Sequence, residues 1–390
     1  MSTPFGRASS AAGRERARPA FAFSAFLVMG VFDGTLGVAW PSMRVELHQP
    51  LDALGLLLIY STAGFLLVNL LLNPVIDRLG VRGALTAGSG LFVVAQLLIG
   101  LGPWPGVVLG AVIWGVASGL VNAAINVYST VRMSGAAMQV LHGLWGVGTL
   151  LGPLLVTASL VSGHSWRPPI VLAAGGELVL LAWVLAGPAW PDPRRNRLGA
   201  PPFRLSAPLV LGLAAFFLYT AAEWTGGQWS FTVLTESRGF STAAAGLVVS
   251  SYWTGLTAGR LLSGVAGLRF TTERLLAAGV ALAMAAAAGF WLYPAWSALE
   301  LPLLGLGLAP IYPALMKLTL QRVPEATVGL AVGLQTASGG LGSALAPAGV
   351  GLAMQRLGLP LLGPLIFALT VLTAAAGLVA QIPRPRSRES

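Results

Sequence analysis

The stretch "FFLYTAAEWTGGQWSFTV", Phe216–Val233, is apolar enough to lie inside a membrane, but it holds an acid, Glu223, near its centre. Similar apolar runs recur along all 390 residues, of which 55% are hydrophobic and 9% are charged. A soluble protein carries about 25% charged residues, whereas runs of about twenty apolar residues are typical of membrane-spanning helices. The composition therefore predicts an all-α membrane protein.

Twelve such runs are present, and most connections between them are short, which leaves no room for a soluble domain. The predicted cores of the runs are Phe21–Met43, Leu54–Ile76, Ala84–Gly102, Gly106–Val127, Val140–Val161, Ile170–Gly187, Leu209–Thr232, Ala243–Gly264, Leu275–Tyr293, Leu301–Leu318, Val328–Ala353 and Leu361–Ile382. The sequence thus predicts twelve transmembrane helices.

The one long polar connection separates six runs from six. We therefore expect five regions, namely a cytoplasmic tail at residues 1–20, a six-helix bundle at 21–190, a cytoplasmic linker at 191–206, a second six-helix bundle at 207–382 and a cytoplasmic tail at 383–390. The halves also echo each other, because a shift of 190 positions aligns Asp33 with Glu223 and Gly37 with Gly227. Such repeats are typical of secondary transporters, whose substrate site lies at the repeat interface near the middle of the membrane.

The distribution of basic residues predicts the orientation. The formal net charge is +10, and most arginines lie in the terminal tails and in every second connection. The other connections hold only Arg44, Arg167, Arg238 and Arg356. Basic residues gather on the cytoplasmic side, so we expect both termini there. Because topology explains the charge, we expect no nucleic-acid partner. A single lysine among many arginines favours a prokaryotic inner membrane.

The two aligned acids, Asp33 and Glu223, are the candidates for proton coupling. An acid at a helix centre costs about 2.5–3.5 kcal/mol on insertion scales, so two at equivalent depth predict a water-filled cavity between the bundles. Burial disfavours the charged form of a carboxylate, which allows it to bind and release a proton. The alternative is a structural hydrogen bond or ion pair. Arg260, on the next helix, could pair with Glu223 or an anionic substrate, or extend to the cytoplasmic surface; we count it as a gating candidate.

The connection "NPVIDRLGVRGAL", residues 73–85, resembles the cytoplasmic signature of the major facilitator superfamily, G-x-L-x-D-R-x-G-R-[RK]-x-x-L. The match includes Asp77, Arg78, Gly80 and Arg82, while Asn73 departs from the leading glycine. The resemblance implies a major facilitator fold, with twelve transmembrane helices in two pseudo-symmetric six-helix bundles. It also implies a role for Asp77, Arg78 and Arg82 in gating the cytoplasmic side.

Within that superfamily the chain resembles the fucose-permease-like transporters. The stretch "GLVNAAINVY", residues 119–128, is similar to a glycine-rich segment of that group ending in E-T-A-A-N-P, and Asn126 matches its asparagine. Asn122 stands where fucose permease has a carboxylate. Asp33 resembles the aspartate that this group uses in proton coupling, so the resemblance implies that role for Asp33; it does not identify a sugar.

Several polar and aromatic residues are candidates for substrate binding. Asn122, Asn126 and Trp114 share one helix face, and amides beside an aromatic ring suit the hydroxyl groups of a sugar. Hydrogen bonds between helices are the alternative role for these amides. The other candidates are Trp40, Trp145, Gln228, Trp253, Tyr312 and Gln335.

The sequence therefore predicts a monomeric secondary transporter that moves a small, sugar-like solute with protons across a lipid bilayer by alternating access. Proton-coupled export of drugs or other amphiphilic compounds is the alternative. We expect no enzyme activity, because the short loops carry no catalytic cluster. We also expect no metal or cofactor, since neither metal-ligand spacing nor a phosphate-binding loop is present. A receptor that binds solute without transporting it is a further alternative, and Glu177 and His142 have no assigned role.

Overall fold

The structure is a computed structural model that describes residues 4–187, 190, 207–320, 323 and 327–379. All regular secondary structure among these residues is helical. The elements are α1 (Pro4–Glu46), α2 (Ala53–Leu70), α3 (Leu72–Leu101), α4 (Trp104–Arg132), α5 (Gly135–Val161), α6 (Arg167–Ala186), α7 (Ala207–Glu236), α8 (Thr242–Ala266), α9 (Thr272–Leu292), η1 (Pro294–Trp296), α10 (Ser297–Leu308), α11 (Ile311–Leu320), α12 (Val328–Leu357), η3 (Leu359–Leu361) and α13 (Leu362–Val379).

The predicted all-α membrane fold is confirmed. Within the described ranges, ten helical segments are long and apolar enough to cross a membrane, and one of them joins α10 to α11. Helices α8 and α12 complete the predicted twelve, although they do not reach the same apolar content. These two helices pack against α5 and α2 across the middle of the molecule. Several of their polar side chains, namely Ser250, Thr257 and Gln335, are accordingly buried.

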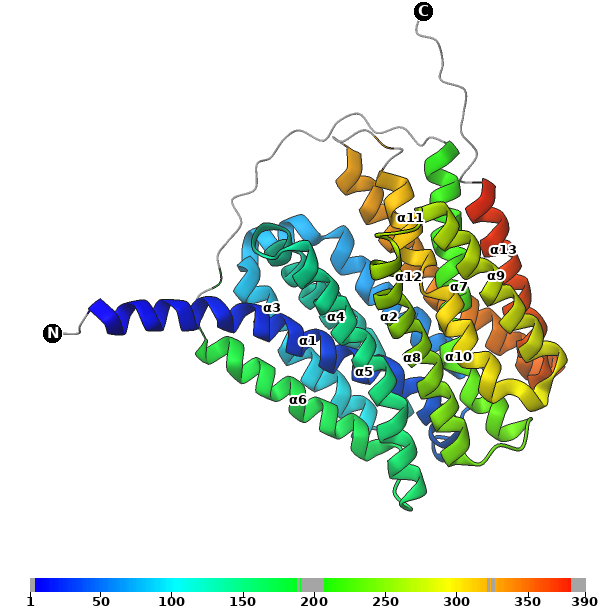
Figure 1. The fold of residues 1–390 in the computed structure, drawn as a ribbon. Coiled ribbons are helices and arrows are strands. Elements are labelled where there is room, and N and C mark those ends of the chain that lie inside the picture. The colour runs from blue at the N-terminus through cyan, green and yellow to red at the C-terminus, as the bar shows by residue number, and fades with distance from the viewer. Residues whose placement is uncertain (1–3, 188–189, 191–206, 321–322, 324–326, 380–390) are drawn as a thin grey trace, which may run out of the picture.

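The helices pack as two groups, which we call the N-half (α1–α6) and the C-half (α7–α13). In Figure 1 the N-half runs from blue to green on one side, and the C-half runs from green to red on the other. Within the N-half, α1 packs on α5, and α4 packs on α2 and α3; within the C-half, α7 packs on α12 and α13, and α10 packs on α8 and α9. Three helix pairs join the halves: α5 with α8, α2 with α12, and α1 with α7.

One expected boundary is wrong. The run predicted to end at Ile76 stops earlier, because α2 ends at Leu70 and α3 begins at Leu72. The signature connection is thus helical on both sides of Gly80. Gly80 interrupts α3 with a backbone φ of 63°, which residues other than glycine rarely adopt. The predicted tail is mostly an extension of α1, which starts at Pro4.

The run predicted at residues 301–318 lies within one apolar segment, Pro294–Leu318, which is interrupted between α10 and α11 at Pro310. Proline has no backbone N–H and its ring clashes with the preceding turn, so an α-helix breaks there. The break directs α11 separately toward α7 and α9, which it contacts. It therefore sets the position of Tyr312 beside the candidate site.

Polar contacts link the halves at one end of the molecule, which we call the distal end because it lies opposite the start of α1 and the end of α13 (Figure 1). Arg44, near the end of α1, donates to Glu236 at the end of α7, with a closest N–O distance of 2.7 Å. The backbone N–H of Leu51 donates to Oε1 of Gln355 in α12 at 2.9 Å. Side chains and backbone of both halves thus meet at the distal end.

Candidate transport site

A cavity of about 100 Å³ lies between the two halves. Its walls come from α1, α2, α3, α4, α7 and α12, so it faces both halves of the repeat. The lining residues are Phe32, Asp33, Leu36, Leu57, Leu58, Ser61, Thr62, Ile99, Val107, Ala111, Trp114, Trp224, Gln228 and Ser343. Of the described residues in this lining, Asp33 alone carries a formal charge.

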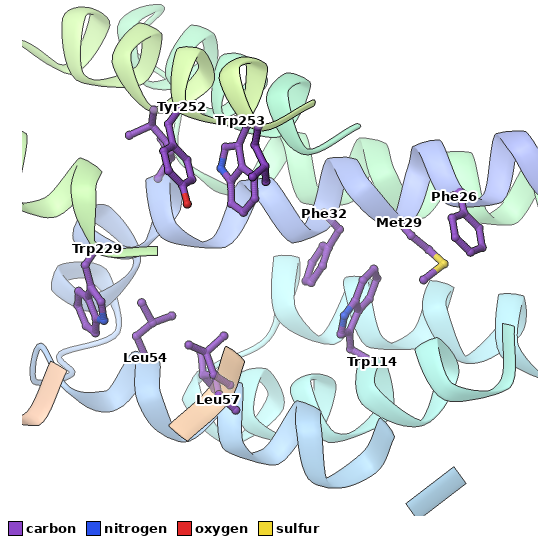
Figure 2. Packing of buried hydrophobic residues seen from close by; sticks show 14 of the residues in the cluster. Phe26, Met29, Phe32, Leu54, Leu57, Trp114, Trp229, Tyr252 and Trp253 are labelled. Carbon is purple, nitrogen blue, oxygen red and sulfur yellow. The ribbon is translucent and has the colours of Figure 1, made fainter. Parts of the chain in front are cut away.

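The cavity has an aromatic wall and a polar wall. The ring centroids of Phe32 and Trp114 lie 3.9 Å apart, and Figure 2 shows the two rings lying against each other from α1 and α4. The carboxylate of Asp33, the amide of Gln228 and the hydroxyl of Ser343 supply polar groups. Such a combination of apolar surface and a few polar groups is typical of small-molecule sites.

Close packing of α1 on α5 positions Asp33. A Cβ atom on Gly30 or Gly34 would collide with the backbone of α5, and one on Gly148 or Gly152 would collide with the backbone of α1. The two backbones therefore approach as closely as small residues permit. At this distance the indole Nε1 of Trp145 donates to Oδ2 of Asp33 across 2.9 Å.

Glu223 has a different environment. Its side chain is 3% exposed and forms an ion pair with Arg260 of α8, whose Nη2 lies 3.0 Å from Oε2 and 3.1 Å from Oε1. The same Nη2 donates to the hydroxyl of Tyr219. The predicted pairing of Arg260 with Glu223 is therefore confirmed, and the alternative of a side chain extended to the surface is wrong. An opposite charge at this distance stabilises an ionised carboxylate.

Three tryptophans pack against one another across the interface between the halves. The ring centroids of Trp145 (α5), Trp224 (α7) and Trp253 (α8) lie 6.0–6.4 Å from one another. The guanidinium of Arg260 lies 5.9 Å from the Trp145 ring centroid, within the range of a cation–π interaction. Trp145 therefore contacts Asp33 with its N–H and the C-half with its ring.

The other substrate candidates have separate places. Trp40 is fully buried and its indole donates to the carbonyl of Leu51 at the distal end. Asn122 donates to the carbonyl of Ser118 in its own helix, and Asn126 is exposed. None of these three lines the cavity. Their predicted role in binding remains a prediction for another state of the protein.

Tyr312 and Gln335 lie in the C-half, outside the cavity lining. The Tyr312 ring packs on Tyr219 and lies 5.9 Å below the guanidinium of Arg260, so it belongs to the surroundings of the ion pair. Gln335 is fully buried in α12. Trp253 is also buried, and its Nε1 has no hydrogen-bond partner among the described residues.

The residues of the signature connection lie at the end of the molecule opposite the distal end. Asp77, Arg78 and Arg82 are exposed there. Arg82 donates to the carbonyl of Leu185 across 2.8 Å, close to the C-terminus of α6. A cation at this position satisfies a free helix carbonyl and complements the helix dipole. The contact joins α3 to α6 within the N-half, and the gating role of these residues stays a prediction.

Sequence reasoning missed the hydroxyl groups of the site. Ser61 and Thr62 of α2 and Ser343 of α12 line the cavity, but the sequence alone does not distinguish them from other hydroxyls in apolar runs. Ser343, for instance, also donates to the carbonyl of Gly340 in its own helix. Glu177 of α6 is buried in the N-half, and its Oε1 has no hydrogen-bond partner within the described part of the chain.

Comparison with known proteins agrees with this architecture. The chain is 24% identical over 391 aligned residues to Bypass of stop codon protein 6 from Saccharomyces cerevisiae, with 86% of this chain and 76% of that protein covered. It is 25% identical over 250 residues to an uncharacterized transporter of the major facilitator type from Yersinia pestis, with 61% and 62% covered.

Two solved structures share the fold. The first is a mutant of the nucleoside transporter NupG, with a TM-score of 0.76, 15% identity, and 93% of this chain and 99% of that chain covered. The second is a bacterial homologue of the human lysosomal transporter Spinster in an inward-facing and occupied conformation, with a TM-score of 0.70, 15% identity, and 92% and 94% covered. The sequence profile of the Major Facilitator Superfamily matches residues 22–347. The chain belongs to the major facilitator superfamily.

Proposed function

We propose that this protein is a proton-coupled secondary transporter of a small, neutral, polar solute of the sugar-like class. It works as a monomer by alternating access in the inner membrane of a prokaryote, with both termini in the cytoplasm. The observation that carries the proposal is the cavity between the halves, in which Asp33 is the one charged residue of the described lining.

The proton is assigned first to Asp33. Its carboxylate lies at the cavity and has an indole N–H as its hydrogen-bond donor, whereas Glu223 has the guanidinium of Arg260. Neutralising Asp33 requires no rearrangement of an ion pair, so a proton can bind there with little structural cost. Glu223 takes part by holding Arg260 in place, and exchanges this partner for a proton when the halves move.

The class of solute follows from the charges and the polar groups. The described lining contains no basic side chain that would balance an anion. The amide of Gln228 and the hydroxyls of Ser61, Thr62 and Ser343 suit the hydroxyl groups of a neutral solute, and the Phe32 and Trp114 rings offer an apolar face. NupG, which shares the fold, is a nucleoside transporter, and nucleosides belong in the panel that tests the proposal.

The distal contacts support alternating access. Arg44–Glu236 and Leu51–Gln355 link the halves at one end of the cavity. Breaking them while forming contacts at the opposite end would expose the cavity to the other side of the membrane. One proton crossing about 100 mV supplies about 2.3 kcal/mol, which supports roughly fortyfold accumulation of solute. The transport cycle needs no other energy source.

The test is uptake of labelled hexoses, pentoses and nucleosides into proteoliposomes under an imposed pH gradient. Accumulation that collapses with a protonophore supports the proposal. A second candidate function is proton-coupled export of amphiphilic compounds, which the apolar surface of Phe32, Leu57, Leu58 and Trp114 favours. That function is supported instead if the protein protects a susceptible host against such compounds and accumulates no member of the panel.

A further inference from the structure

Trp145 contacts one charged group in each half, Asp33 and Arg260. Its Nε1 donates to Oδ2 of Asp33 in the N-half across 2.9 Å. Its ring lies 5.9 Å from the guanidinium of Arg260 and 6.4 Å from the rings of Trp224 and Trp253, all in the C-half. The indole thus connects an acid on one side of the interface to an ion pair on the other.

The hydrogen bond of Trp145 to Asp33 lies within the N-half, whereas its ring contacts cross to the C-half. Trp145 and Asp33 lie on α5 and α1, whose backbones are locked together by reciprocal glycine contacts at Gly30 and Gly148. Helix α8, in contrast, belongs to the other half and moves relative to α5 when the halves rearrange. The hydrogen bond to Asp33 therefore persists through such a motion, while the ring contacts with Arg260 and Trp253 are made and broken.

We propose that Trp145 is the positioning residue that transmits the protonation of Asp33 to the α5–α8 interface and to the Arg260–Glu223 ion pair. The inference rests on the proposed function, because it takes Asp33 to be the proton-binding acid. It assigns to Trp145 a coupling role beyond its predicted place as a substrate-binding residue.

The physical basis is the change in strength of one hydrogen bond. A hydrogen bond to an ionised carboxylate is roughly twice as strong as one between neutral groups. The charged form of Asp33 therefore holds the indole firmly in the orientation that packs its ring against Arg260 and Trp253. Protonation weakens that bond, the ring gains freedom to turn, and the α5–α8 contact loses a rigid partner.

Other titratable groups lie on the same and neighbouring helices. Within the predicted membrane-spanning cores of α1, α5 and the helices packed against them, they are His142 on α5, Glu177 on α6, Tyr219 and Glu223 on α7, and Tyr252 and Arg260 on α8. His142 packs against the ring of Phe26. Among the described residues, only Trp145 donates a side-chain hydrogen bond to Asp33. Loss of this hydrogen bond therefore removes the side-chain donor of Asp33 within the described residues.

The test compares Trp145→Phe with Trp229→Phe in solute exchange and in gradient-driven accumulation. Trp145→Phe keeps an aromatic ring but removes the N–H donor of Asp33. The variant removes the side-chain hydrogen bond that the described residues donate to the Asp33 carboxylate, so we expect the midpoint of the pH profile of exchange to shift. Accumulation falls because the ring no longer responds to Asp33. Trp229→Phe removes an indole bond to the carbonyl of Pro347 and leaves the midpoint unchanged.

A midpoint equal to that of the wild type in Trp145→Phe, with normal accumulation, overturns the inference while leaving the proposed function intact. Failure of the proposed function is seen separately, as normal gradient-driven accumulation by Asp33→Asn.

A second measurement uses the wild-type indole signals and so does not depend on the folding of Trp145→Phe. Among the indole resonances of the twelve tryptophans, one should titrate with pH in the wild type and become insensitive in Asp33→Asn. An identical set of pH responses in both proteins also overturns the inference.

Discussion

Asp33 and Glu223 occupy aligned positions in the two halves, but only Glu223 has a cationic partner among the described residues. Arg260 lies 3.0 Å from the Glu223 carboxylate, whereas Asp33 accepts one hydrogen bond from a neutral indole. Both halves therefore carry an acid at the aligned position, but the two acids have different surroundings. Of these two acids, Asp33 has no ion pair to break within the described part of the chain, whereas Glu223 is part of an ion pair inside the C-half.

The buried ion pair gives the first prediction. Removing one partner leaves the other charge buried and unpaired, which costs about 3–5 kcal/mol. We therefore expect Glu223→Gln and Arg260→Met each to lower the melting temperature of the purified protein strongly, while the double variant recovers most of the loss. Thermal unfolding in detergent measures this. Strictly additive losses in the double variant would show that the two side chains do not stabilise each other.

The second prediction concerns the close approach of α2 to α12 near the distal end. A Cβ on Gly55 would lie 2.6 Å from Cα of Ala348, so Gly55→Leu should wedge the halves apart there. Gly349→Leu, next to Ala348, is the matched control, because a Cβ on Gly349 meets nothing within 4 Å. The readout is labelling of Ser343→Cys by an impermeant maleimide added on the distal side.

The protein contains no cysteine of its own, so that label reports the cavity residue alone. We expect several-fold faster labelling with Gly55→Leu and an unchanged rate with Gly349→Leu. Equal rates in the two backgrounds would mean that this helix contact does not close the distal end.

The ion pair between Arg44 and Glu236 gives the third prediction. Both side chains are partly exposed, at 24% and 29%, and such pairs contribute about 0.2–1 kcal/mol. Arg44→Ala should therefore shift the balance of states by a few-fold, because 1.4 kcal/mol is a factor of ten. The distance between spin labels at Val45→Cys and Ser237→Cys, one in each half, measures this. In Arg44→Ala, a larger share of molecules should show long distances than in the protein with Arg44 intact.

The charge swap Arg44→Glu with Glu236→Arg should return that distance distribution toward the wild type, because it restores the attraction in reverse. If the swapped protein resembles Arg44→Ala instead, the pair does not hold the distal end closed.

The sequence predicts the helices and the acids, because hydropathy and the repeat are visible along the chain. It leaves the partner of Asp33 unassigned, since Trp145 is 112 residues away and meets it only through the glycine packing of α1 on α5. For Arg260, sequence reasoning named Glu223 on the preceding helix as one of three alternatives, beside an anionic substrate and the cytoplasmic surface. Prediction therefore succeeds where partners lie on consecutive helices.

Trp40 illustrates the opposite case. Its spacing of seven residues from Asp33 places it on the same face of α1, but seven residues also advance it about 10 Å along the helix. Its indole consequently bonds to Leu51 at the distal end, outside the cavity lining. A shared helix face does not give a shared depth. The hydroxyls of Ser61 and Ser343 were missed because such groups often bond to their own helix, so residue type alone does not indicate a cavity.

The most direct measurement is proton movement on addition of the solute that the wild type accumulates, in proteoliposomes containing either the wild type or Asp33→Asn. We expect proton flux with the wild type, none with Asp33→Asn, and solute exchange in both, because exchange needs no net proton transfer. Solute-driven proton flux through Asp33→Asn at the rate of the wild type would contradict this expectation.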